Sequence, residues 1–168
     1  MNRIGIYRLH EGIEIPEIKT QNSACFDLKV DFKAFGSVVT YDEDNEKGSL
    51  QVEGGKLRIP PRRRVMIPMG FILDIPEGYS VRIHPRSSVA LKRGLMLVNQ
   101  EAVIDNDFVE ELQLLIWNST ETLVSIENGE RIAQGELVRM EGVHFENMTY
   151  RPLQKTDRQG GIGSTGKR

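Results

Sequence analysis

From residue 79 to residue 98 the chain reads YSVRIHPRSSVALKRGLMLV, and this stretch carries the main signals of the fold. YSVRIH and LMLV are short apolar runs with a period close to two, which predicts two β-strands. Between them, residues 87–93 predict one short helix. Ser87 or Ser88 is expected to cap it, and Gly94 is expected to close it. The stretch therefore predicts a β protein with a short helix set between strands.

The same short pattern continues on both sides of this stretch. The further runs are KLRI, RVMIPM, FILDI, ELQLLIW, TLVSIE and RIAQGELVRM. They are separated by turn-forming groups, namely PEG at 76–78, DND at 105–107 and NGE at 128–130. Regularly spaced short strands predict an all-β barrel or sandwich, here one β-rich domain over residues 1–157. Residues 41–56 are acidic and glycine-bearing, which predicts a long hairpin loop or an added ribbon at the surface.

Composition excludes several classes of protein. The chain has 168 residues and a net charge of −2, so no overall field draws it to nucleic acid or to an anionic membrane. PPRRR at 60–64 lacks a wider basic face and is expected to protect a strand edge rather than to bind nucleic acid. Cys25 is the only cysteine, the three histidines are scattered, and no apolar run approaches the roughly 20 residues that span a bilayer. A cytoplasmic location, in a host cell if the source is viral, is the expectation.

Three polar clusters are hard to explain by packing alone. Arg86 and the two serines after it offer a guanidinium fork and several N–H donors, which suits an anion, although an ordinary helix cap would use the same residues. Asp105 and Asp107 would share one face of an extended strand, so one of them is in a turn or works as a general base. Gln134 lies among apolar residues and needs a partner, either the sheet edge or a ligand oxygen.

The chain ends in RQGGIGSTGKR, at residues 158–168, which is too flexible to fold alone and too polar to pack. It is either a disordered tail or a clamp that orders over phosphate groups. Its G-x-x-x-x-G-K segment is not a phosphate-binding P-loop, because Arg168 follows the lysine where Ser or Thr is needed and no helix follows.

Taken in order, five segments resemble the motifs of the homotrimeric deoxyuridine triphosphatase (dUTPase) family. They are SACFDL (23–28), PRSSVALKRG (85–94), NQEAVIDNDF (99–108), GERIAQ (129–134) and RQGGIGSTG (158–166). The resemblance covers the chain from about residue 20 to its end apart from residues 41–56, and five ordered motifs are a specific signal. It implies a jelly-roll-like fold, a homotrimer whose sites are built from several subunits, and hydrolysis of dUTP to dUMP and pyrophosphate.

The resemblance also implies roles for individual residues. Asp105 would activate the water that attacks the α-phosphate. The phosphate ligands would be Arg86, Ser87, Ser88 and Gln134, together with Arg158, Gly163, Ser164 and Thr165 from the tail of a neighbouring subunit. Magnesium would be carried by the phosphates without direct protein ligands, and Asp27 would either act on it through water or only support the site. The base and the sugar would be bound by Asn99, Ala102, Val103, Ile104, Phe108 and Ile162.

The sequence departs from the family pattern mainly where the base is read. Ile162 stands where the family usually has a stacking Phe, Phe108 replaces Tyr, and Ala102 and Cys25 replace glycines. Two alternatives therefore stay open: a related pyrophosphohydrolase acting on dCTP or a modified pyrimidine nucleotide, and a non-catalytic nucleotide-binding regulatory trimer. The sister dCTP deaminases need a glutamate and an arginine at positions that match Leu115 and Leu91, which disfavours deamination.

Overall fold

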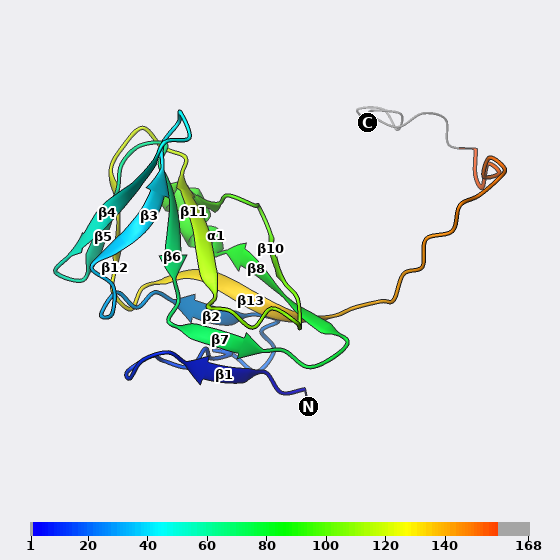
Figure 1. Ribbon diagram of the computed structural model, residues 1–168, viewed down its shortest axis with the longest axis horizontal. Helices are drawn as coiled ribbons and strands as arrows, with labels where there is room; N and C mark the ends of the chain where they lie inside the picture. The colour runs from blue at the N-terminus through cyan, green and yellow to red at the C-terminus, as the bar shows by residue number, and fades with distance from the viewer. Residues whose placement is uncertain (1, 158–168) are drawn as a thin grey trace.

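The computed structural model describes residues 2–157, and β-strands dominate its folded body (Figure 1). Along these residues the strands are β1 (Gly5–Arg8), β2 (Phe26–Lys29), β3 (Ser37–Tyr41), β4 (Lys47–Glu53), β5 (Lys56–Ile59), β6 (Arg64–Pro68), β7 (Phe71–Asp74), β8 (Tyr79–Pro85), β9 (Leu95–Leu97), β10 (Ala102–Ile104), β11 (Gln113–Asn118), β12 (Val124–Glu127) and β13 (Arg131–Arg139), with helix α1 (Ser87–Arg93). The prediction of an all-β fold with one short helix is confirmed for the part of the chain that the structure describes.

The strands form two larger sheets and one separate pair. Seven strands pair in the order β12-β5-β4-β3-β6-β11-β9, four pair in the order β10-β8-β13-β2, and β1 pairs with β7. Within the four-stranded sheet all three pairings are antiparallel. The four-stranded sheet contains β2, β8, β10 and β13, which carry parts of four of the five motif segments.

The core follows from the alternation along the strands. On β8, Val81 and Ile83 are fully buried, whereas Arg82 and His84 between and after them are only half-buried. Strand β11 repeats the pattern with Leu114 and Ile116, and one cluster of buried side chains takes members from both larger sheets. Each fully buried aliphatic side chain contributes roughly 1.5–3 kcal/mol, so this alternation is what holds the sheets together.

The helix begins and ends where the sequence predicts, but its N-terminal cap differs. Gly94 closes the helix in the left-handed conformation, with φ of 62°, and its N–H donates to the carbonyl of Ala90. The N-cap residue is Arg86, and no side chain caps the helix there. The expectation that Ser87 or Ser88 would be the cap is therefore wrong. Both serines are exposed in the first turn, where their hydroxyls are available to a ligand.

The segment at 41–56 supplies regular structure to the larger sheet. It contains the β3–β4 turn, strand β4 and the Gly54–Gly55 turn into β5, and β4 lies between β3 and β5 in the sheet. Strands β1 to β4 were not predicted as separate strands. The reason is visible in β4, whose residues are mostly exposed, so that its sequence shows no apolar alternation.

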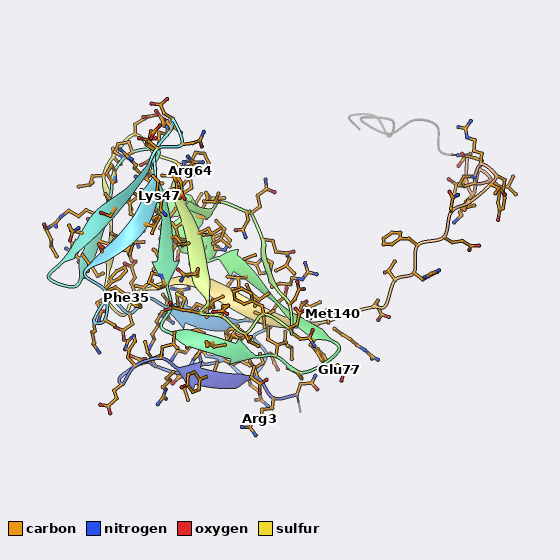
Figure 2. All side chains as sticks on the ribbon, viewed as in Figure 1. Arg3, Phe35, Lys47, Arg64, Glu77 and Met140 are labelled. Carbon is orange, nitrogen blue, oxygen red and sulfur yellow. The ribbon has the colours of Figure 1, made fainter. Side chains whose placement is uncertain are left out.

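The arginine run at 62–64 joins separate loops of the molecule. Arg62 donates to the carbonyl of Ser119 at 2.8 Å, and Arg63 pairs with Asp42 at 3.4 Å. Arg64 donates to Asn45 Oδ1 at 3.0 Å across the β3–β4 turn, and Figure 2 shows it beside the start of β4. Strand β6 lies inside the sheet, so the expectation that this run protects a strand edge is wrong.

After β13 the chain leaves the body as an extended arm, residues 141–157, which Figure 1 shows in orange. Met140 is still anchored, because its N–H donates to the carbonyl of Gly78 at 2.8 Å, and Figure 2 shows Met140 close to Glu77. The large apolar side chains of the arm are mostly exposed, namely Val143, Phe145, Met148, Tyr150 and Leu153. Within residues 2–157, no helix is both long and apolar enough to cross a membrane.

Candidate functional site

An open cleft of about 380 Å³ lies where β2, β13 and the start of α1 meet. It is lined by Lys19, Ser23, Ala24, Cys25, Asp27, Arg86, Ser87, Ser88, Arg131 and Gln134. All four core residues predicted to hold phosphate are in this set, and so is Asp27. The cleft is therefore rich in side-chain donors and contains a single carboxylate among its lining residues.

The register of the four-stranded sheet explains why these side chains meet. Gln134 on β13 lies opposite Asp27 on β2 and opposite His84 on β8. Arg86 follows β8 directly, and its backbone N–H donates to the carbonyl of Ile132 at 3.3 Å. Residues far apart in the sequence are thus held at one end of β8 by main-chain hydrogen bonds.

A β-bulge aims Arg131 at the cleft. The register between β13 and β2 shifts between Arg131 and Ala133, and the consecutive residues Ile132 and Ala133 are both buried. In a regular strand Arg131 would share the core-facing side of Ala133. The extra residue turns it to the face that carries Gln134, which is a common use of a bulge beside a binding site.

Asp27 connects the two arginines of the cleft. Its Oδ1 lies 3.1 Å from Nε of Arg86 in an ion pair, and its Oδ2 accepts a hydrogen bond from Nη1 of Arg131 at 2.7 Å. Arg86 also donates through Nη1 to the backbone carbonyl of Arg131 at 3.2 Å. The Asp27 side chain is only 14% exposed, which makes this pair of contacts stronger than a surface ion pair.

The residues predicted to bind the base and the sugar lie on a different part of the sheet. Strand β10 pairs with β8 through Ala102 opposite Ile83, Val103 opposite Arg82 and Ile104 opposite Val81. Asn99 lies in the turn before β10, and Asp105 and Phe108 lie in the turn after it. Asp105 and Asp107 do not share a strand face as alternation suggested, because β10 ends at Ile104 and a turn follows.

Ala102 fits its position without backbone strain. The three non-glycine residues with positive φ in the described part of the chain are Asn45, Arg62 and Gln100. Ala102 is buried in a regular strand pair, and the tight turn is made by Gln100 instead, at φ of 61°. Residue 102 therefore does not adopt the left-handed backbone conformation that would favour glycine, and alanine is accommodated without strain.

Asp105 and the cleft lie at opposite ends of β8. Ile104 on β10 pairs with Val81, near the start of β8, and Asp105 follows Ile104 in the direction that leads away from the cleft. Arg86 lies at the other end of β8, five residues after Val81. At about 3.3 Å per residue, Val81 and Arg86 are roughly 17 Å apart. One chain alone does not bring Asp105 to the cleft. The predicted tail residues Arg158, Ile162, Gly163, Ser164 and Thr165 lie outside the described residues.

Five lining residues were not predicted as ligands: Lys19, Ser23, Ala24, Cys25 and Arg131. The signal for Arg131 was the broken alternation at Ile132 and Ala133, which indicates a bulge. Burial raises the pKa of the Cys25 thiol, and the nearby carboxylates of Glu136 and Asp27 raise it further. Cys25 is therefore a protonated thiol at neutral pH, and not a thiolate nucleophile.

The donor set of the cleft suits a phosphate chain better than a bare metal ion. Within residues 2–157 no three Asp, Glu, His or Cys side chains converge in a way that could hold a metal. The one carboxylate of the cleft is already engaged by two guanidinium groups. Arginine forks, serine hydroxyls and an amide are typical ligands of phosphate oxygens, so the donors of this cleft are chemically suited to phosphate groups.

Comparison with known proteins identifies the family. The family model described as dUTPase matches residues 55–166. The deoxyuridine 5′-triphosphate nucleotidohydrolase of Brucella melitensis is 32% identical over 166 residues, which cover 97% of this chain and 92% of that protein. The chain belongs to the dUTPase family.

Solved structures show the same fold at lower identity. The dUTPase of Staphylococcus bacteriophage 80alpha, solved with dUPNHPP, matches with a TM-score of 0.76 and 20% identity, covering 99% of both chains. A dUTPase variant from phage phi11 of S. aureus, described with a structural Mg(II) ion, matches with a TM-score of 0.69 and 16% identity, covering 89% of this chain and 99% of that one. These matches confirm the predicted fold class.

Proposed function

We propose that this protein hydrolyses dUTP to dUMP and pyrophosphate, with its phosphate chain bound in the cleft between β2, β13 and α1. The observation that carries the proposal is the convergence of Arg86, Ser87, Ser88 and Gln134 on one open cleft. Membership of the dUTPase family supports the choice of dUTP as the substrate.

In the proposed reaction the two arginines neutralise the phosphate charge, and the serine hydroxyls and the Gln134 amide orient its oxygens. The Asp105 carboxylate takes a proton from water as the water oxygen attacks the α-phosphorus. The bond between the α-phosphorus and the bridging oxygen breaks, and pyrophosphate leaves. Mg²⁺ carried by the phosphates, without direct protein ligands, would offset part of their negative charge.

The distance between Asp105 and Arg86 implies that the reacting site is shared between copies of the chain. We infer a homotrimer in which one protomer supplies the cleft and a neighbour supplies Asp105 with the β10 segment. The exposed apolar side chains of the arm support an assembly, because residues such as Phe145, at 91% exposed, have no packing partner within the described chain.

The base and the sugar are assigned to the turns around β10. Asn99 and the backbone of Ala102–Ile104 would bind the uracil edge, and the flat ring of Phe108, which is 40% exposed, would lie under the sugar. Tail residues 158–168 would close over the phosphates from a neighbouring protomer. Ile162 would then make an apolar contact with the base in place of aromatic stacking.

The test is release of pyrophosphate by the purified protein with Mg²⁺ from dUTP, dTTP, dCTP, dATP, dGTP and UTP. We expect dUTP to be hydrolysed far faster than the others. Preference for dCTP or a modified pyrimidine would show that Ala102, Phe108 and Ile162 have changed the base pocket. If the protein binds nucleotides tightly but releases pyrophosphate from none of them, it is a nucleotide-binding or regulatory protein.

A further inference from the structure

A second open hollow lies beside the phosphate cleft. It has a volume of about 470 Å³, compared with about 380 Å³ for the cleft. Arg86, Ser88 and Arg131 line both spaces, and the rest of the hollow is lined by α1 and by the β12–β13 turn at Gly129 and Glu130. The hollow is therefore a continuation of the cleft past its two arginines.

The side chains around this second hollow are mainly cationic. Lys92 and Arg93 line it together with the two shared arginines, and Glu130 is the one carboxylate among its described lining residues. Both oxygens of Glu130 are already engaged, one by Nη1 of Arg93 and the other by the backbone N–H of Glu127 at 3.0 Å. Positive charge exceeds negative charge here, so the hollow favours an anion.

Lys92 is the cation of the hollow that no neighbour neutralises. Within residues 2–157 its ammonium has neither a hydrogen-bond acceptor nor an ion-pair partner, whereas Arg93 is held by Glu130 and by the carbonyl of Ser125. The last turn of α1 is a favourable place for a cation because of the helix dipole, but this leaves the three N–H donors of the ammonium free. Lys92 lines the hollow and not the cleft, so it marks the end of the combined space away from Gln134.

Two other occupants match the hollow poorly. The tail at residues 158–168 carries three cationic side chains and no acidic one, so like charge opposes its seating beside Lys92. A nucleobase would find Val89 as the one apolar side chain among the described lining residues. A phosphate group fits better, because it needs cations and N–H donors.

We propose that the second hollow binds a fourth phosphate of a linear chain, with Lys92 as its ligand. The ligand class is a linear polyphosphate of four or more phosphate groups, either free or attached to a nucleoside. The numbering of the phosphates rests on the proposed function above, in which the first three occupy the cleft. Arg86 and Arg131 then lie at the junction between the third phosphate and the fourth, because they line both spaces.

The experiment measures the Kd of the intact protein for inorganic tripolyphosphate and for linear inorganic tetrapolyphosphate, by calorimetry at fixed ionic strength. The wild-type protein is expected to bind tetrapolyphosphate about fivefold more tightly or better, since one charge pair near 4 Å in water is worth about that factor. Lys92→Gln should remove most of this advantage and leave the Kd for tripolyphosphate unchanged, because Lys92 does not line the cleft.

Matched variants separate this contact from general charge. Lys47→Gln removes another exposed lysine, on β4 and outside both spaces, and should leave the ratio of the two Kd values unchanged. Lys92→Arg keeps the charge and should keep the advantage. A wild-type ratio in the Lys92→Gln protein would overturn the proposal, and so would an equal weakening of both chains.

Deoxyuridine 5′-tetraphosphate, tested as a competitor of dUTP, distinguishes the two sources of the ligand. If Lys92→Gln weakens its competition, the hollow accepts the end of a nucleotide chain, and if only tetrapolyphosphate responds, the ligand is a free polyphosphate. A wild-type protein that shows the Lys92-dependent advantage but releases no pyrophosphate from dUTP would refute the proposed function and leave the subsite standing. Hydrolysis of dUTP without any such advantage would overturn the subsite alone.

Discussion

Asp105 and Arg86 stand at opposite ends of strand β8, Asp105 after the Ile104–Val81 pair and Arg86 directly after Pro85. The extended strand between them separates Val81 from Arg86 by roughly 17 Å, which is too far for a general base and a phosphate ligand to act on one α-phosphate. If both residues act on the same nucleotide, they come from different copies of the chain.

Mixed assemblies test this arrangement. Arg86→Ala and Asp105→Asn protomers are each expected to be nearly inactive alone. After they are unfolded and refolded together in equal amounts, roughly a quarter of the sites would combine an intact Asp105 with an intact Arg86 from a neighbour. Pyrophosphate release from dUTP measures the recovery. A mixture that stays as inactive as its components would show that one chain supplies both residues.

Asp105→Asn should separate binding from chemistry. The amide keeps the shape of the side chain but cannot take a proton from water, so dUTP hydrolysis is expected to fall about 10²-fold or more. Affinity for a non-hydrolysable dUTP analogue should be retained. Asp107→Asn, two residues further along the same exposed turn, is the matched control and should keep most of the activity. Unchanged turnover in the Asp105→Asn variant would show that Asp105 is not the general base.

Deletion of residues 158–168 is expected to abolish most of the hydrolysis without unfolding the protein. The segment supplies a cation and several glycines and hydroxyls, and ordering it costs about 1–2 kcal/mol per residue, so it should close only over a charged ligand. Size-exclusion chromatography checks that the assembly survives, and turnover is measured at saturating dUTP. Full turnover by the shortened chain would contradict the clamp.

Asn118 is expected to be the most costly polar residue of the body to remove. It is fully buried, and its Nδ2 lies 3.0 Å from the carbonyls of Ile59 and Pro60 and 2.8 Å from that of Thr122. Asn118→Ala removes the buried amide donor from all three carbonyls and should lower the free energy of unfolding by about 2–4 kcal/mol. Thermal unfolding at fixed protein concentration measures the change, with Ser49→Ala on exposed β4 as the control. If Asn118→Ala lowers the melting temperature no more than Ser49→Ala does, the predicted contribution of Asn118 to stability is contradicted.

Cys25 should react slowly with alkylating reagents at neutral pH. Burial and the carboxylates of Glu136 and Asp27 raise the pKa of its thiol, so the thiolate fraction is smaller in the folded protein than in the unfolded chain. The rate of iodoacetamide labelling should therefore begin to rise at a higher pH in the native protein than in urea. Glu136→Gln removes one of the carboxylates and should move the native profile toward lower pH. Identical native and denatured profiles would contradict the predicted shift.

Local sequence was sufficient to predict the strands in which alternate residues are apolar and face the core. KLRI coincides with β5, and the runs that begin at Tyr79 and Arg131 coincide with the starts of β8 and β13. The alternation fails for β4, which is largely exposed, and for the start of β13, where a bulge places two apolar residues side by side. Those elements depend on neighbours distant in the chain, which no local window contains.

The sequence by itself determined the class of fold, the short helix at Ser87–Arg93 and the polar, donor-rich character of the cleft residues, because these depend on periodicity, turn residues and local side-chain chemistry. Only the tertiary structure decided that Asp27 lies between Arg86 and Arg131, and that Asp105 lies at the far end of β8. Both relationships follow from strand register between segments up to 104 residues apart. Register is set by the packing of the whole core, and single segments do not contain that information.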